Sequence, residues 1–414
     1  MKITTVEAVN QLTTRWARRS ATADKGTVLT AAGMWPLLAF LADGAAGPAR
    51  TELAEALGIP AEAAAGAARE LLTGLAGVRG LQAATGLWTR ADLPLHEPWL
   101  ARLPDGARGT LTGDEDTDHK ALDAWAEQGT GGLVETMPVT LDAEMPLVLA
   151  SALGLRLRWA EPFTERPRRT HSEGPWQGRA LRGLHRTTRT TSELDRVRVT
   201  DGAAGPVTTL EVAGADEVDV HLILGEPHVP PGDVLATGLA SVTGGAPSTG
   251  AGSLDEGQPG PGLTLRTVDA YAPEPQLHVA TVAFSVRAEH DLLAHARLFG
   301  LEAATDDEHG HFPGISSTAL AVGSARQAAT AAFSATGFEA AAVTAVAARY
   351  AAGMPPRPKY RARRAELSFE RPFGFLAVHR TTRLVLAAGW VSDPLPAPAP
   401  RLSGVTSRPW SVRR

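Results

Sequence analysis

The densest group of side chains able to bind a metal lies between Asp306 and His311. Two aspartates, a glutamate and two histidines offer carboxylate oxygens and imidazole nitrogens, which divalent cations take as ligands. The spacing matches neither a metal-binding pair of helical histidines nor a calcium loop, and Phe312-Pro313-Gly314 follows as a turn. We therefore interpret the segment as a solvated loop, and we predict no metal and no cofactor.

Other signatures of catalytic chemistry are missing from the sequence. No strand precedes a GxGxxG run, and neither a GxxxxGK phosphate loop nor a GxSxG nucleophile elbow occurs. Cysteine is absent, which excludes thiolate nucleophiles, disulfides and cysteine-based metal sites. His379 lies between two apolar runs and is interpreted as a turn histidine rather than a general base. We expect a protein that is not an enzyme.

One basic run, 357–364, has a candidate binding role. It contains Lys359, Tyr360 and four arginines, a pattern that is usually a solvated loop. The alternative is an exosite that attracts an acidic partner. The whole chain has 40 basic and 45 acidic residues, and its net charge of −5 indicates neither nucleic acid nor a membrane as a partner.

The segment 336–348 supports two interpretations. Its alanines favour a helix, which Thr336 could cap and Gly353 could end. Every second residue from Phe338 onward is apolar or small, however, and that alternation also suits a strand with one face in a core. The choice depends on the rest of the chain.

The rest of the chain predicts an α+β fold. Helical periodicity covers 6–20 and 31–75, whereas alternating strand patterns dominate after Pro206. Because helices come first and strands later, without βαβ regularity, we expect antiparallel sheets. Further predicted elements are strands at 81–90, 147–157, 207–212, 218–224, 277–286 and 384–391, a helix at 118–135 broken at Gly131-Gly132, a helix at 291–299, and a mobile Gly/Pro/Ser-rich loop at 243–262. The start of the chain resembles no export signal, so we expect a cytoplasmic protein, with export by another route left open.

Five motifs in order resemble those of the serpin family, the serine protease inhibitor fold, in a bacterial-type member. The most distinctive is the C-terminal signature Leu367–His379, which is followed at the family's spacing by 384–394. The other motifs contain Leu41, Gly44, Ala45 and Gly47; Trp125, Thr130 and Gly132; 147–152 with Trp159, Pro162 and Phe163; and Phe312 to Ser316.

The resemblance implies a single domain over 1–414, with three antiparallel or mixed sheets, about eight to nine helices and an exposed reactive loop. The loop and hinge fall at about 335–366. The resemblance also implies a suicide mechanism, in which a peptidase cleaves the loop and is trapped while the loop inserts into a sheet. The implied hinge residues are Gly337, Phe338, Glu339, Ala340, Ala341, Ala342, Val343 and Thr344.

The family's spacing also locates the cleaved bond. Counting from the hinge Gly337 reaches Ala351, and the proline pair that some relatives carry beyond the cleavage position indicates Ala352. We predict cleavage between these alanines, which suits an elastase-like or subtilisin-like serine peptidase acting on a monomer. Arg349 and Tyr350 are alternative specificity residues, and Arg349 would indicate a trypsin-like target.

Two departures from the family pattern leave a non-inhibitory alternative open: a protease substrate, or a binding or carrier protein that uses the basic 357–364 loop. Phe338 is bulky where relatives carry a small residue, so a crowded cavity could slow insertion. The polar cluster at which the strands part also differs from that of relatives. The residues assigned to sheet opening are Thr30, Gly33, Ser151, Gln327 and Trp159.

Overall fold

The computed structural model describes residues 1–170, 173–338 and 359–398. In these ranges the chain forms nine α-helices and three large sheets. The helices are α1 (Ile3–Ser20), α2 (Ala31–Gly44), α3 (Gly47–Leu57), α4 (Ala61–Ala76), α5 (Glu97–Leu100), α6 (Glu115–Thr130), α7 (Thr191–Leu194), α8 (Pro231–Thr243) and α9 (Ala296–Phe299), with 3₁₀ turns η1 (Leu293–His295) and η2 (Ala303–Thr305). No helix in the described part of the chain is both long and apolar enough to cross a bilayer.

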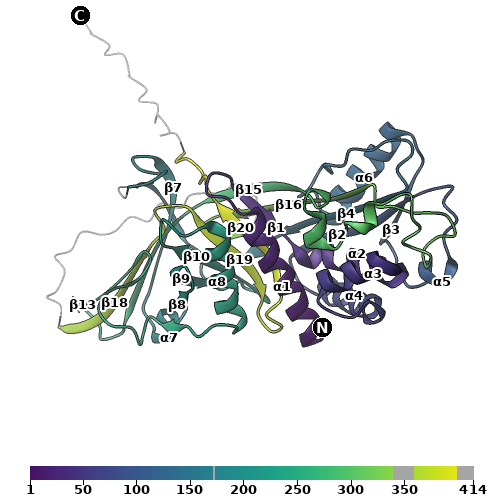
Figure 1. Cartoon of the computed structure of the whole chain (residues 1–414). Helices are drawn as coiled ribbons and strands as arrows, with labels where there is room; N and C mark the ends of the chain where they lie inside the picture. Colours follow the sequence, from purple (N-terminus) through teal and green to yellow (C-terminus); the bar gives the residue numbers. More distant parts are fainter. Residues whose placement is uncertain (171–172, 339–358, 399–414) are drawn as a thin grey trace, which may run out of the picture.

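The five-stranded sheet has the order β15-β16-β4-β2-β3 and runs across the molecule above α2, α3 and α4 (Figure 1). Its two middle strands, β16 and β4, are parallel neighbours. The strands are β15 (Phe284–Asp291), β16 (Ser324–Phe333), β4 (Leu147–Leu155), β2 (Leu81–Arg90) and β3 (Arg108–Leu111).

The six-stranded sheet places β18 between β13 and β14, at the end of the molecule away from α2–α4 (Figure 1). Its strands are, in order, β12 (Gly257–Gly260), β13 (Leu263–Ala270), β18 (Tyr360–Ser368), β14 (Gln276–Val282), β7 (Ala180–Thr188) and β6 (Thr164–Arg169).

The seven-stranded sheet joins the C-terminal strands to the start of the chain. Its order is β1 (Thr27–Leu29), β20 (Val385–Val391), β19 (Phe373–His379), β10 (Val218–Gly225), β9 (Gly205–Val212), β8 (Val197–Gly202) and β11 (Thr249–Gly250). A separate pair is formed by β5 (Leu157–Arg158) and β17 (Gly337–Phe338).

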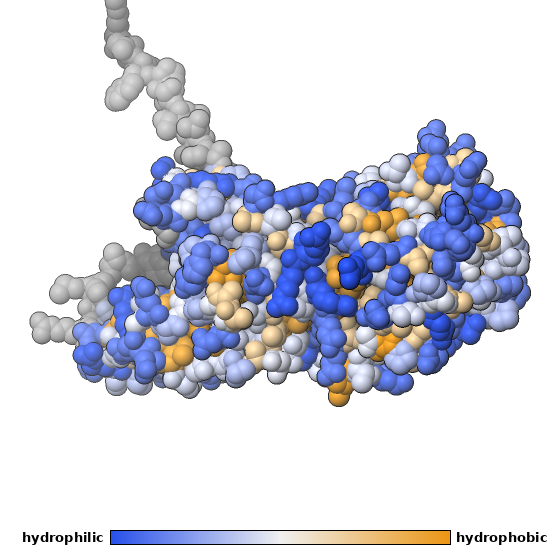
Figure 2. Space-filling model, viewed as in Figure 1, coloured by the Kyte–Doolittle hydropathy of each residue, from blue (hydrophilic) through white to orange (hydrophobic). Residues whose placement is uncertain are grey.

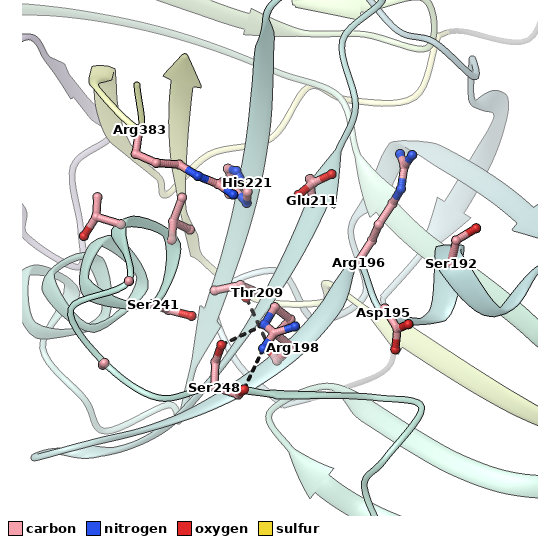
Figure 3. A pocket seen from close by; sticks show the side chains of 14 residues that line it. Ser192, Asp195, Arg196, Arg198, Thr209, Glu211, His221, Ser241, Ser248 and Arg383 are labelled. Carbon is pink, nitrogen blue, oxygen red and sulfur yellow. Dashed lines mark hydrogen bonds between the residues drawn. The ribbon is translucent and has the colours of Figure 1, made fainter. Parts of the chain in front are cut away.

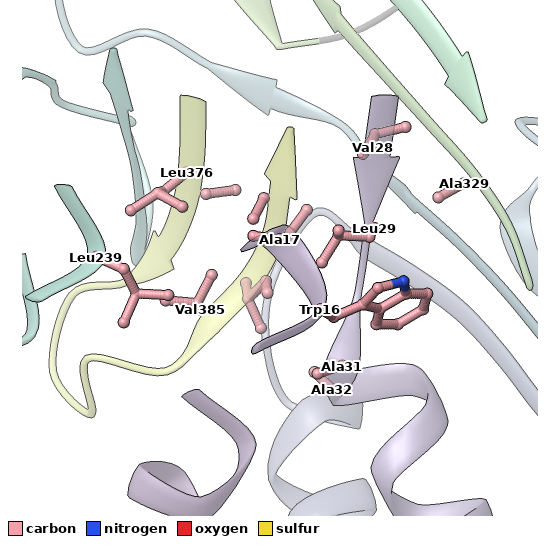
Figure 4. Packing of buried hydrophobic residues seen from close by; sticks show 14 of the residues in the cluster. Trp16, Ala17, Val28, Leu29, Ala31, Ala32, Leu239, Ala329, Leu376 and Val385 are labelled. Carbon is pink, nitrogen blue, oxygen red and sulfur yellow. The ribbon is translucent and has the colours of Figure 1, made fainter. Parts of the chain in front are cut away.

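The main core lies where α1 and α2 pack on the sheets. Trp16 of α1 contacts the rings of Phe299 and His290 edge-on, at 4.9 Å and 5.1 Å between ring centroids. Leu29 of β1 and Val385 of β20 lie in the same cluster (Figure 4). Almost every residue of α2 is buried, as expected of a helix that is apolar on all sides. The helix is therefore fixed on every face.

A second, smaller core lies beneath α6 on the five-stranded sheet. Trp125 of α6 meets Trp88 of β2 edge-on at 5.9 Å, and Leu122 is fully buried. The helix begins after Asp114, whose carboxylate accepts from the Thr117 amide at 2.9 Å. It ends at Gly131, which adopts φ +59°, at the break predicted for the 118–135 helix at Gly131-Gly132.

Two expectations from the sequence are corrected. The predicted mobile loop at 243–262 contains β11 and β12, because Arg363 donates to the carbonyls of Ala251 and Leu254 and ties the segment down. The basic run predicted as a loop over 357–364 becomes strand β18 from Tyr360 onward, which pairs with β13 from Tyr360 and also with β14 from Arg364. Predicted strands at 81–90, 147–157, 207–212 and 218–224 are confirmed, with 147–157 divided into β4 and β5.

Hydrophilic residues cover most of the face shown in Figure 2, where hydrophobic residues form separate small groups. Large hydrophobic side chains that are exposed in the described ranges are Ile3, Tyr271 and Tyr360. The face shown therefore has no broad apolar surface of the kind that marks a stable protein interface.

Candidate functional site

The seam between β16 and β4 is the first part of the site. The strands pair in parallel from Ser324 opposite Val148 to Thr330 opposite Gly154. Beyond that point they no longer pair with each other, and β17 lies there, antiparallel to β5 and in contact with β16. The seam is thus closed along most of its length and occupied at one end by a two-residue strand.

A tight turn directs the chain from β16 into β17. The Ser334 amide donates to the Gly337 carbonyl at 2.8 Å, and the Ser334 hydroxyl accepts from the Gly337 amide at 3.2 Å. The Thr336 carbonyl accepts from the Trp159 amide at 3.0 Å. These bonds reverse the chain, so Gly337 and Phe338 occupy the first two positions of a strand that starts between the ends of β16 and β5.

Gly337 is required here by close backbone contact. A Cβ at this position would lie 2.0 Å from the Leu157 carbonyl oxygen, a distance that real side chains do not reach. Any larger residue would therefore move β17 away from β5.

Phe338 is fully buried in an aromatic cluster. Its ring lies edge-on to four others, with centroids 5.7 to 6.5 Å away: Trp159, Phe284, Phe333 and Phe375. Trp159 is held in turn by its indole N–H, which donates to the Ser334 carbonyl at 2.9 Å. The sequence argument treated Phe338 as an obstacle to insertion, whereas the structure provides a packed site for its ring.

Four of the five residues assigned to sheet opening come together further down the seam. Gln327 of β16 bonds the Thr30 backbone twice: its Oε1 accepts from the amide at 2.8 Å, and its Nε2 donates to the carbonyl at 2.9 Å. Ser151 faces Gln327 across the seam, and a Cβ on Gly33 would lie 2.3 Å from its Oγ. Trp159 is separate, since it packs on Phe333 at the other end of β16.

The hydrogen bonds of this polar cluster are incomplete. The hydroxyls of Ser151 and Thr30 are buried and have no partner among the described residues. A buried hydroxyl without a partner loses its hydration and gains nothing in return. The seam is therefore closed by backbone pairing, whereas Gln327 ties β16 to the residue that precedes α2.

The remaining predicted residues of the loop lie outside the described ranges. These are Glu339, Ala340, Ala341, Ala342, Val343, Thr344, Arg349, Tyr350, Ala351 and Ala352. The chain is described again from Lys359, whose amide donates to the Ala270 carbonyl at 3.2 Å, and it then forms β18. The predicted loop thus starts at the seam and ends in the six-stranded sheet.

Several side chains of the basic run form contacts within the protein. Arg364 donates to Gln276 Oε1 from Nε and Nη2 at 3.1 and 2.9 Å, and Arg363 bonds the 251–254 backbone. Glu366 pairs with Arg266 at 2.5 Å. Of the three arginines available to the alternative exosite, Arg361, Arg363 and Arg364, two therefore have structural roles.

A cavity of about 640 Å³ lies on the seven-stranded sheet beside the end of α8 (Figure 3). Glu211 of β9 and His221 of β10 are directly opposite each other on its floor, and Arg383 reaches His221 from the β19–β20 turn. Burial lowers the pKa of His221 to about 4, and burial followed by the charge of Asp219 raises the pKa of Glu211. No described residue forms a hydrogen bond with the His221 ring. A neutral imidazole therefore faces the cavity among charged groups.

Sequence reasoning missed this cavity and the aromatic cluster around Phe338. The alternation in β10 places Asp219 and His221 on one face, which was the available signal for a polar floor. For the aromatic cluster no local signal exists, because its rings come from five separate segments.

Comparison with known proteins identifies the class. The sequence matches the family model of Serpin (serine protease inhibitor) over residues 7–173 and 269–394. The chain belongs to the serpin family. A search of the curated proteins gave no match.

Solved structures share the fold at low identity. Human thyroxine-binding globulin complexed with thyroxine is 17% identical, with a TM-score of 0.71 over 95% of this chain and 98% of that one. Native protease nexin-1 with heparin is 14% identical, with a TM-score of 0.69 over 95% and 99%. Serpin48 of the insect Tenebrio molitor is 19% identical, with a TM-score of 0.65 over 94% and 97%. The α+β serpin fold expected from the motifs is thereby confirmed.

Proposed function

We propose that this serpin inhibits a serine-type peptidase by the suicide mechanism. The peptidase cleaves between Ala351 and Ala352, and the freed segment inserts between β16 and β4. The observation that carries the proposal is the position of β17: Gly337 and Phe338 already pair with β5 at the open end of the seam. Insertion would extend a strand that has started.

The proposed insertion has a defined inward face. Phe338 points into the core, and side chains alternate along an extended strand. A continuation of β17 would therefore turn Ala340, Ala342 and Thr344 inward, toward the core that underlies the seam. The small size of these residues suits fast insertion, because little has to be repacked.

The test uses elastase-like, subtilisin-like and trypsin-like peptidases, followed by denaturing electrophoresis. We expect a stable complex of summed mass with a peptidase that has a small primary pocket. Ala342→Arg should convert the protein into a substrate, because a guanidinium would have to be buried on insertion. Ala341→Arg is the matched control, since its side chain would face outward. Cleavage near 349–352 without any complex, from the unmodified protein, contradicts inhibition.

A second candidate function is carriage of a small organic ligand in the cavity above Glu211 and His221. The specific observation is the neutral, unbonded imidazole on its floor beside Arg383. Thyroxine is a suitable probe, because a similar fold is solved with it. Saturable binding that Arg383→Asn weakens at least tenfold supports carriage, and asparagine tolerates the φ of +61° at this position. No saturable binding contradicts it and leaves the inhibitory proposal unaffected.

A further inference from the structure

Three side chains of the 306–311 segment converge on one point, although their spacing matches no known metal motif. Asp306 Oδ2 lies 2.8 Å from His309 Nδ1 and 3.4 Å from His311 Nε2. The three ligand atoms all lie within 4.8 Å of one another. The segment connects η2 to the buried Phe312 and includes no residue of the seam strands β16 and β4.

The carboxylate is oriented by the backbone and not only by the histidines. Asp306 Oδ1 accepts from the amides of Glu308 and His309 at 2.9 and 3.3 Å. These bonds occupy one oxygen and leave Oδ2 facing both imidazoles.

The second histidine is fixed to the body of the protein. The His311 side chain is only 13% exposed, and its carbonyl accepts from the Ala46 amide between α2 and α3 at 2.8 Å. Gly314, just beyond it, donates its amide to the Gly44 carbonyl at 3.0 Å. One ligand is therefore held in place before any ion binds, which lowers the entropy lost on binding.

We propose that Asp306, His309 and His311 form a binding site for Zn²⁺ or a similar borderline divalent cation. Two imidazole nitrogens and one carboxylate oxygen suit zinc, which binds such ligands at about 2.0–2.2 Å. Water would complete the coordination. The ion would replace the hydrogen bonds that now join Oδ2 to the two rings, and small movements of the exposed His309 would bring its nitrogen into range.

The expected consequence is a local clamp. The ion would tie the 306–311 segment to the junction of α2 and α3 through His311. Because the chain has no cysteine, no thiolate site competes for zinc, and binding must use imidazole or carboxylate groups. The clamp is independent of the inhibitory function, since none of its ligands belongs to the seam.

The test is calorimetric titration of the full chain, without any histidine tag, with ZnCl₂. We expect one ion per chain and at least a tenfold loss of affinity in His309→Ala, in His311→Ala and in Asp306→Asn. His228→Ala, which removes an exposed histidine in the β10–α8 connection, is the matched control and should bind as the unmodified protein does. Circular dichroism with chelator present checks that each variant is folded.

A second measurement identifies the ligands. Co²⁺ bound at the same site should give the visible absorption of a nitrogen- and oxygen-ligated ion, and His309→Ala should abolish it. Absence of saturable zinc binding overturns the proposal, and so does equal affinity in the ligand variants and in His228→Ala. Equally tight binding of Mg²⁺ would also overturn it, because that ion prefers oxygen ligands.

Discussion

The segments on either side of 339–358 are held in the protein in opposite ways. On one side, β17 is described over Gly337–Phe338, and its strand partner among the described residues is β5. On the other side, β18 has nine residues and pairs with β13 and with β14. The first segment is held by this one strand pairing and by the buried ring of Phe338, so it can be released or extended without opening a large sheet, whereas the second cannot move without opening one. In a serpin whose loop is cut, the part that moves should therefore be the part attached to β17.

Alanine substitutions in the two strands should show this difference most strongly. Leu367 is buried between Leu263 and Val279, and Leu367→Ala should lower the free energy of unfolding by about 2–5 kcal/mol. Phe338→Ala removes a larger buried side chain but should cost less, because β17 can detach locally while the sheets stay folded. Urea unfolding midpoints measure both. An equal or larger loss in Phe338→Ala would mean that β17 unfolds only with the whole protein.

The next largest effect is expected at a pair of glutamines. Gln327→Ala leaves the buried amide and carbonyl of Thr30 without their partner, which should cost about 1–3 kcal/mol. The control is Gln276→Ala in β14, whose side chain accepts from the partly exposed Arg364 and should matter less. Thermal unfolding distinguishes them. Equal losses would show that Gln327 has no special part in tying β16 to Thr30.

Much of the fold could be predicted from the sequence, because it depends on the order of the serpin motifs and on the periodicity of apolar residues. The strands over 81–90 and 218–224 could be predicted because their local residue patterns are typical of strands. The resemblance assigned Ser151 and Gln327 to one polar cluster, and the structure adds the register that sets them opposite each other. What failed depended on contacts distant in sequence: Tyr360 became a strand residue because it pairs with Ala270 of β13, and Phe338 found a site among rings from other segments.

A smaller effect, of opposite sign in the two regions, is expected from serine substitutions. Ser151→Ala should raise the free energy of unfolding by about 1 kcal/mol, because it removes a buried hydroxyl that has no partner. Ser368→Ala, in β18, should lower it, since this hydroxyl accepts from Arg168 at 2.6 Å and donates to Glu370 at 3.2 Å. The thermal unfolding midpoints of the two variants measure both changes. A loss of stability in Ser151→Ala would show that its hydroxyl is satisfied.

The smallest effect concerns pH. Burial lowers the pKa of His290, which lies opposite Gln327 in the β15–β16 pair, and also that of His278 in β14. A histidine with a lowered pKa in the folded state takes up its proton first in the unfolded state. Its contribution is therefore complete above the unfolded value of about 6.5 and is lost as pH falls below that value. Since His290 is the more deeply buried, His290→Gln should flatten the fall in unfolding midpoint between pH 7 and pH 5 more than His278→Gln does. Urea titrations of both variants at pH 7 and pH 5 measure this. If His278→Gln flattens the fall more than His290→Gln does, the more acid-sensitive histidine lies in the six-stranded sheet.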